Sequence, residues 1–491
     1  MPSLILLATA QAGDFMDVAV TTALEDTNVR AGPEYFSPGP NFVMRGNQTF
    51  FENYEGRYTD DISQSHLVLY KRSDGFREGW WTEAAMVIQF TPYLDPDGSE
   101  PGVDLSDDGS YVRIVRELGS EDHTLSLTGY AVDAGRFRLG YSYDLSYGGR
   151  EMLTPAVGAM PGARLQWQKG GHYAFLGAKT AINQAVDETW DGNRNAAYNS
   201  FLAGGGLTFA ERVRVEAGLG SFQQGQMTNT GSAADANYGA PIVALGTSAQ
   251  VAFRTTTELD FIQSGELRLY RNSPDFMRDT YISHDTLDGV GVLVQVEGNR
   301  LVHNLLDADT VGNIVNESAI AADVQARVVV FKTTLYGDLV YKDLPYIVFN
   351  VPGLTSGTSI PSSLDTTPQL YWRFGLSHYF PDAHVTPAFG VGMMQPATYT
   401  DSETGKIYVQ YTERDKEQVP DEYDQAYNIL GSVLSVQYDI SPSTIAVGEL
   451  LYTLDNNLSR SVEQDGELVR TPEPQEVRSA LGINLVLRAQ F

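Results

Sequence analysis

The chain has 491 residues, with 33 Lys and Arg against 62 Asp and Glu, and a formal net charge of −29 at pH 7. Nucleic-acid phosphates would repel so acidic a chain, which excludes a nucleic-acid partner. The sequence has no cysteine, which excludes disulfides and thiolate metal sites. It also has no run of about 18 apolar residues, so it offers no transmembrane helix.

The N-terminus has features of an export signal. Residues 4–8 form a short apolar core, and Ala10-Gln11-Ala12 before Gly13 fits a small-x-small cleavage site. A basic segment is missing, because the first cationic residue is Arg30. We interpret residues 1–12 as a truncated signal peptide with a mis-set start codon; the alternative is a short buried strand.

Alternation of apolar and polar residues predicts the first strands at 17–26, 66–72 and 82–91. In the third, Ala84, Met86, Ile88 and Phe90 share one face. Residues 28–61 are rich in Gly, Pro and Asn and predict a long loop. Residues 95–108 hold six acidic and no basic residues, which favours a solvated acidic loop.

Strands are predicted next at 111–116 and 124–131, and then most clearly at 136–147. In that segment an apolar and aromatic row alternates with a polar row that contains Arg136, Arg138 and Asp144. The apolar row is Phe137, Leu139, Tyr141, Tyr143, Leu145 and Tyr147. Aromatic residues near one end of a lipid-facing row are typical of an interfacial girdle, so we expect this row to face lipid.

The pattern continues to the end of the chain. Further strands are predicted at 163–168, 198–209, 212–222, 245–254, 265–271, 289–303, 323–328, 335–341, 369–380, 385–393, 427–440, 444–454 and 479–491. Short turns, such as those at 332–334, 381–383 and 441–443, alternate with long polar loops at about 345–366, 395–425 and 455–474. This alternation fails near 119–135 and near 224–287, and dropping one candidate strand at each place leaves 18; counts of 16 and 20 stay open.

The last strand ends on an aromatic residue. Ile483, Leu485 and Leu487 alternate with Asn484, Val486 and Arg488 before the terminal Phe491, so the second face is mostly polar. This ending resembles the C-terminal assembly signal of bacterial outer-membrane β-barrel proteins, although the residue two before the end is Ala489 rather than an aromatic. The resemblance implies insertion by the barrel-assembly machinery and contact with outer-membrane lipid and lipopolysaccharide.

We therefore predict an all-β protein in which residues 13–491 form a single closed antiparallel transmembrane β-barrel with short periplasmic turns and long extracellular loops. Closure is required because each unpaired backbone N–H or C=O of a sheet edge costs several kcal/mol in lipid. Glycines at inward positions leave room in the wall of such a barrel.

Charged residues on the polar strand faces are the candidate pore-lining residues. Arginine on a lipid face costs about 2–4 kcal/mol at the bilayer midplane, so these side chains should point into the lumen. The candidates are Arg136, Arg138, Asp144, Arg212, Arg214, Glu216, Asp323, Arg327, Arg373 and Arg488. A basic wall facing acidic loops resembles the arrangement in general porins; the alternative is that the charges pair with one another only to fill the barrel.

Other chemistry has little support in the sequence. There is no G-x-S-x-G or GxxxxGK motif, and Gly218-x-Gly220 lacks the third glycine of a dinucleotide fingerprint. No cofactor is predicted. The acidic segment begins Asp95-Pro96-Asp97-Gly98, and Asp95, Asp97, Asp107 and Asp108 are candidate ligands for a divalent cation that could bridge to lipopolysaccharide, but the spacing misses that of an EF-hand.

The sequence therefore predicts a porin-like outer-membrane channel for passive diffusion of small hydrophilic solutes, and not an enzyme. Two alternatives stay open. The first is a barrel hydrolase acting on lipid or envelope polymer, because cross-strand Ser and His neighbours can lie far apart in the chain. The second is a non-conducting structural or adhesion barrel that displays its long loops.

Overall fold

The structure is a computed structural model of the chain. It describes residues 16–26, 28–30, 62–75, 77–94, 101–107, 109–135, 137–140, 145–148, 159–187, 192–227, 237, 239–259, 261, 286–349, 357–411, 416–464 and 466–490.

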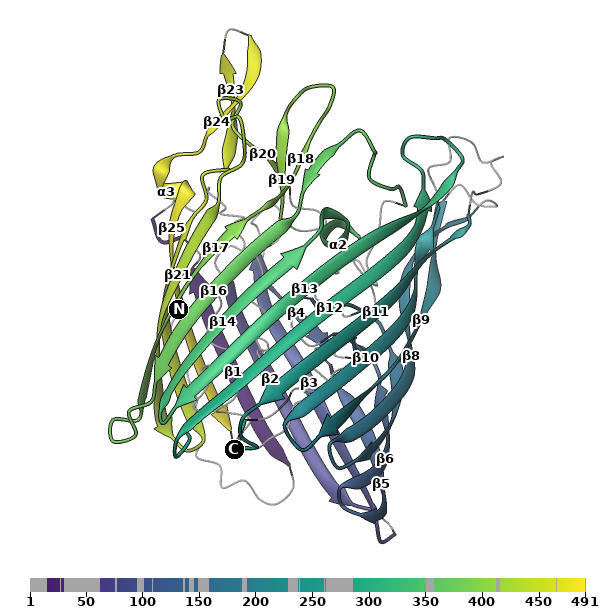
Figure 1. The fold of residues 1–491 in the computed structure, drawn as a ribbon, viewed down its shortest axis with the longest axis vertical. Helices are drawn as coiled ribbons and strands as arrows, with labels where there is room; N and C mark the ends of the chain where they lie inside the picture. Colours follow the sequence, from purple (N-terminus) through teal and green to yellow (C-terminus); the bar gives the residue numbers. More distant parts are fainter. Residues whose placement is uncertain are drawn as a thin grey trace.

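A closed antiparallel β-sheet forms the body of the molecule (Figure 1). It holds 19 strands, of which β4 (Pro101–Asp107) pairs only with β3, so 18 form the ring. The ring consists of β1 (Asp17–Asp26), β2 (Ile62–Asp74), β3 (Trp80–Leu94), β5 (Tyr111–Ser120), β6 (His123–Tyr130), β7 (Gly162–Lys169), β8 (His172–Asp187), β9 (Gly192–Phe209), β10 (Val213–Gln226), β11 (Pro241–Arg254), β12 (Val290–Leu306), β13 (Ile314–Val330), β14 (Thr333–Lys342), β16 (Gln369–His378), β17 (Val385–Gln395), β21 (Ile429–Ser441), β22 (Thr444–Leu454) and β25 (Ser479–Gln490). Pairing of β1 with both β2 and β25 closes the barrel.

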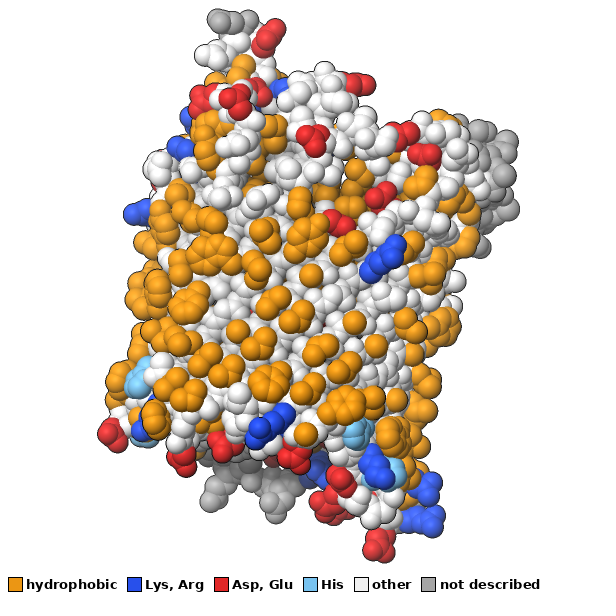
Figure 2. Space-filling model, viewed as in Figure 1, with side chains coloured by type: hydrophobic (Ala, Val, Ile, Leu, Met, Phe, Trp, Pro, Cys, Tyr) orange, Lys and Arg blue, Asp and Glu red, His pale blue; other side chains and the backbone are white. Residues whose placement is uncertain are grey.

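Side chains alternate between the two faces of this wall. On β25, Leu485 is 54% exposed on the outside, whereas Asn484 is fully buried inside. The outward residues of most strands are apolar, and Figure 2 shows their side chains spread over the middle of the barrel, with carboxylates gathered towards its two ends. An apolar outer band between polar ends is what a transmembrane barrel requires.

The connections differ between the two ends of the barrel. At one end the turns are short, such as residues 121–122, 170–171 and 331–332, and at the other end long loops join the strands. One exception is the connection at 255–289, which is long although it lies at the short-turn end: the N–H of Leu287 donates to the carbonyl of Phe331 at that end. A second is the connection between β8 and β9 at the other end, which spans only 188–191. Most other connections follow the predicted pattern of short turns and long loops.

The long loops carry small elements of their own. One four-stranded sheet contains β15 (Asp365–Thr367), β18 (Ala397–Thr400), β19 (Ile407–Gln410) and β20 (Lys416–Gln418), and β23 (Ser459–Gln464) pairs with β24 (Glu467–Pro472). The described helices are α2 (Leu344–Val348) and α3 (Gln475–Arg478). No helix among the described residues is long and apolar enough to cross a membrane.

The predicted count of 18 strands is confirmed, but the assignment of segments needs three corrections. The described part of residues 136–147, which is 137–140 and 145–147, does not form a wall strand. Strand β8, at 172–187, is missing from the predicted set. The acidic segment is not wholly a loop, because its second half forms β4. The predicted strand at 265–271 lies outside the described residues, as do the predicted signal peptide and Phe491.

Candidate functional site: a loop inside the barrel

The connection between β6 and β7 folds onto the inner wall of the barrel. Of its described residues, we call 131–135, 137–140 and 145–148 the lumen loop. Leu139 and Tyr147 exchange two backbone hydrogen bonds, of 3.0 and 2.9 Å, which make the loop a narrow hairpin. Phe137, Leu139 and Leu145 are completely buried. The prediction that the apolar row faces lipid is therefore wrong for its described residues, which pack against the inside of the barrel; Tyr141 and Tyr143 lie outside the described residues.

Three glycines of the wall make room for the loop. A Cβ atom built on Gly177 of β8 would lie 2.6 Å from Phe137 Cε1, and one on Gly246 of β11 would lie 2.5 Å from Tyr147 Cε2. A Cβ on Gly218 of β10 would lie 2.8 Å from Leu139 Cδ2. Real Cβ atoms do not approach other atoms so closely, so the loop can dock only where these strands lack a side chain.

Aromatic rings surround the docked hairpin. Phe137 stacks on Tyr130 with 6.4 Å between ring centroids, and meets Phe175 of β8 edge-on at 6.0 Å. Tyr147 meets Phe222 of β10 edge-on at 5.8 Å. Such pairs contribute about 0.5–1.5 kcal/mol each beyond the area they bury, so apolar packing holds the loop against one side of the barrel interior.

Polar contacts hold the tip of the hairpin. Arg138 Nη2 donates to the carbonyl of Ser146 at 2.8 Å. Asn299 of β12 donates through Nδ2 to the carbonyl of Leu145 at 2.9 Å, and the hydroxyl of Tyr346 in α2 donates to the same carbonyl. The loop that carries α2 therefore also reaches into the barrel and meets the lumen loop.

The predicted pore-lining residues occupy several kinds of position. Arg138 lies in the lumen loop. Buried positions on the inner wall hold Arg214, Glu216, Asp323, Arg373 and Arg488, and Arg327 is half-buried on the same face. Arg212 is exposed in the turn between β9 and β10 rather than in the wall. The side chains of Arg136 and Asp144 lie outside the described residues.

Several inner-wall charges face groups on neighbouring strands. Arg373 of β16 forms an ion pair with Asp338 of β14. Arg113 of β5 lies 3.2 Å from the carboxylate of Glu83 on β3. Arg488 Nε donates to the hydroxyl of Thr21 at 2.9 Å, across the seam that closes the barrel. Cations, carboxylates and hydroxyls thus all contribute to the polar contacts of the interior.

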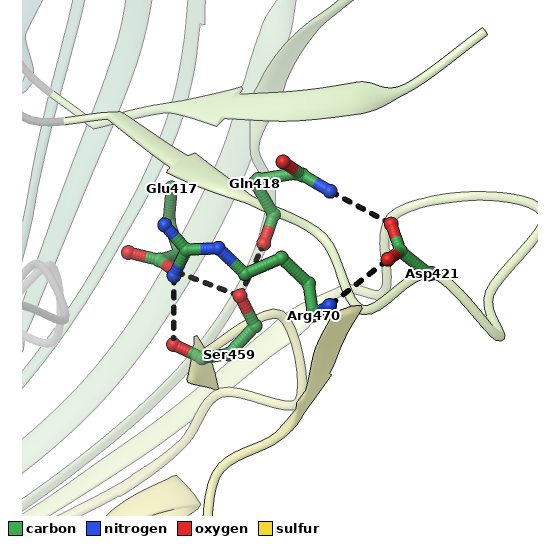
Figure 3. Close-up of polar contacts among 5 residues, drawn as sticks. All are labelled: Glu417, Gln418, Asp421, Ser459 and Arg470. Carbon is green, nitrogen blue, oxygen red and sulfur yellow. Dashed lines mark hydrogen bonds and ion pairs between the residues drawn. The ribbon is translucent and has the colours of Figure 1, made fainter. Parts of the chain in front are cut away.

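The loop that carries β20 meets the hairpin of β23 and β24 at the long-loop end of the barrel (Figure 1), and Figure 3 shows the contact between them. Arg470 Nη1 of β24 lies 3.4 Å from Glu417 Oε1 of β20, and the hydroxyl of Ser459 donates to the same carboxylate oxygen at 2.8 Å. The backbone N–H groups of Arg470 and Asp421 complete the contact: the first donates to the Asp421 carboxylate and the second to the Arg470 carbonyl, both at 2.9 Å. Burial raises the pKa of the Glu417 carboxyl, although Ser459 and Arg470 oppose the shift.

A second contact joins the same two loops at the mouth of the barrel. The hydroxyl of Tyr411 donates to Asp455 Oδ2 at 2.6 Å, and both side chains are buried. The N–H of Asn457 donates to the other carboxylate oxygen at 2.9 Å. Burial raises the pKa of the Asp455 carboxyl.

Of the four candidate cation ligands, only Asp107 lies among the described residues. Asp95, Asp97 and Asp108 lie outside the described residues. The carboxylate of Asp107 accepts from the backbone N–H groups of Ser110 and Asp133, at 3.2 and 3.0 Å, and so fixes the start of the lumen loop. In the part of the chain that the structure describes, no group of three or more His, Asp or Glu side chains is placed to hold a metal ion.

Sequence reasoning missed the residues that receive the lumen loop. Gly218-x-Gly220 drew attention only as an incomplete nucleotide motif, although Gly218 and Gly220 both lie against Leu139. Asn299 and Tyr346 carry no motif. The available signal was the failed alternation of short and long connections near 119–135, beside the segment that proves to be a loop.

A closed 18-stranded antiparallel barrel with an apolar outer band, a charged inner wall and a loop folded into its interior has the architecture of an outer-membrane β-barrel. Solved structures of similar fold include OccAB2 of Acinetobacter baumannii, at 8% identity over 97% of this chain and 98% of that one, with a TM-score of 0.48. They also include the outer membrane protein opdK of Pseudomonas aeruginosa, at 7% identity, 97% and 98% coverage and a TM-score of 0.46. No family model and no curated protein matches the sequence.

Proposed function

We propose that the chain is a porin-like channel through which small hydrophilic solutes diffuse passively across the outer membrane. The observation that carries this proposal is the lumen loop, which lies against one side of a barrel interior whose wall holds buried arginines, carboxylates and hydroxyls. A polar interior suits water and hydrophilic solutes, and a docked loop narrows it.

The barrel should also have two kinds of partner, the lipids of the outer membrane and the machinery that inserts it. The outward apolar rows contact outer-membrane lipid and lipopolysaccharide. The barrel-assembly machinery reads the terminal strand through Ile483, Leu485, Leu487 and Phe491. Deleting Phe491 should therefore reduce the fraction of chain that appears as a heat-modifiable barrel on gels.

Conductance in planar lipid bilayers tests the channel. The purified, folded protein should add discrete, ohmic current steps. A heat-modifiable barrel that inserts but adds no steps would contradict the proposal and favour a non-conducting barrel. A lipid-hydrolysis assay on the same preparation would reveal a barrel hydrolase.

Arg214 should help to set the ion selectivity. Its side chain is 7% exposed on the inner wall, and its Nε donates to the hydroxyl of Thr208 at 3.2 Å. Because arginine stays ionised at physiological pH, Arg214→Ala should move the reversal potential under a salt gradient towards cation preference. The shift should shrink between 0.1 M and 1 M salt, since the screening length falls from about 10 Å to about 3 Å.

Arg212→Ala is the matched control for this measurement. Arg212 is exposed in the turn at the barrel end, so its removal should change the reversal potential less. A folded Arg214→Ala channel with the wild-type reversal potential would show that this arginine does not face the conduction path.

A further inference from the structure

A single lysine of the wall contacts both limbs of the lumen loop. Lys179 lies on the inner face of β8 and is 2% exposed. Its Nζ donates to the carbonyl of Phe137 at 2.6 Å and to that of Ala134 at 3.3 Å, both in the first limb. It also donates to the carbonyl of Gly148, in the second limb.

These three contacts use the full hydrogen-bonding capacity of the side chain, because a lysine ammonium has three donors and no acceptor. Among the described residues, no carboxylate forms an ion pair with Lys179. The loop carbonyls are therefore its close polar partners. This separates Lys179 from Arg113 and Arg373, which form ion pairs across neighbouring strands of the wall.

The ammonium group of Lys179 and the docked position of the loop stabilise each other. A buried ammonium without partners is strongly unfavourable, so the loop cannot leave the wall unless Lys179 becomes exposed to water. Three buried carbonyls would lose their donor in the same movement. Packing of Phe137 against Gly177, two residues from Lys179 on the same face of β8, places the apolar and polar contacts side by side.

We propose that Lys179 is the positioning residue that holds the lumen loop against the barrel wall and so fixes the width of the interior. The effect on conduction rests on the proposed channel function, whereas the effect on the loop does not. The two are therefore measured separately.

Thiol accessibility reports on the loop alone. The native chain has no cysteine, so Ser146→Cys places the only thiol in the loop, at a residue that is 5% exposed. A small charged thiol reagent should modify this cysteine slowly in the otherwise native barrel, and at least about tenfold faster when Lys179→Met is added; this ratio corresponds to about 1.4 kcal/mol.

Ser435→Cys is the matched control. Ser435 is 1% exposed on the inner wall of β21, and its hydroxyl donates to Glu449. Its modification rate should be the same with and without Lys179→Met. If both thiols react faster, the whole barrel has loosened and Lys179 is not a specific anchor. An unchanged rate at Ser146→Cys in a folded Lys179→Met barrel overturns the proposal outright.

Lys179→Gln provides a second variant, which keeps two N–H donors without the charge. It should give an intermediate modification rate, and it replaces Lys179→Met in the comparison if that barrel does not assemble. In bilayers, both variants should show larger open-channel current fluctuations than the native channel. A faster thiol reaction in a protein that never conducts would refute the channel function and leave the anchor standing.

Discussion

A cation placed on either side of one strand tests the architecture directly. Val324 and Gln325 are adjacent on β13, near the middle of a strand of 17 residues. Val324 is 42% exposed on the outer face and pairs with two other outward residues, Val296 and Leu339. Gln325 points inward, and its Nε2 donates to Asp323 Oδ2 at 2.8 Å.

An arginine at position 324 should therefore meet lipid, whereas an arginine at position 325 should meet the polar interior. Val324→Arg puts a guanidinium into hydrocarbon about two residues from the strand centre, at a cost of about 2–4 kcal/mol. At about 1.4 kcal/mol per factor of ten, the ratio of folded to unfolded protein should fall by about 30-fold to about 700-fold. Gln325→Arg places a longer, cationic side chain on the polar inner face, beside the Asp323 carboxylate that already accepts a hydrogen bond, so its cost should be smaller than that of Val324→Arg.

Denaturant titration of the barrel in lipid vesicles, followed by heat modifiability on gels, gives both free energies. Equal losses for the two variants, or a larger loss for Gln325→Arg, would refute the assignment of faces on β13. Loss of folding by both would point to the strand pairing rather than to the environment of the side chains.

Two further predictions concern the loops. Gly218→Leu should expel Leu139 from the wall and give unstable conductance. Gly298→Leu is the control and should leave the channel unchanged, because an added Cβ at Gly298 meets nothing within 4 Å. Similar effects at both glycines would contradict the docking of the loop. Burial raises the pKa of the Glu417 carboxyl in the folded protein, so folding of the two outer loops favours its protonated form. The stability that this group contributes is therefore fully present below its unfolded pKa and is lost as pH rises through its folded pKa. Proteolysis of these loops should be slower at pH 5 than at pH 7.5, and Glu417→Gln should abolish the difference.

Alternation along the chain predicted the faces of strands that meet lipid on one side and polar groups on the other. On β25 the apolar Leu485 faces outward, whereas the polar Asn484 and Arg488 face inward. This separation follows from the sequence because each side chain has its own free-energy cost of contact with lipid. The same contrast disappears in β8. Its inner face carries Tyr173 and Phe175, which pack beneath the lumen loop, so apolar residues occupy both sides of the strand.

In β8 the alternation was too weak to reveal a wall strand; in the lumen loop, alternation predicted a wall strand that is not there. Leu139 and Tyr147 form one isolated bridge, and the apolar residues of the loop are as buried as any in the wall. Alternation reports only that one face avoids water. It cannot distinguish contact with lipid from contact with another part of the chain.

The complement of the loop is spread over three strands, which is why no local pattern reveals it. Gly177, Gly218 and Gly246 are separated by 41 and 28 positions in the chain, and each alone is an ordinary glycine of a β-wall. The barrel register brings them to one side of the interior, where they receive Phe137, Leu139 and Tyr147. The sequence therefore determines the position of the loop through contacts between residues that are distant in the chain. Each of the three glycines makes room for one apolar side chain of the loop, and Lys179 donates to three of its carbonyls.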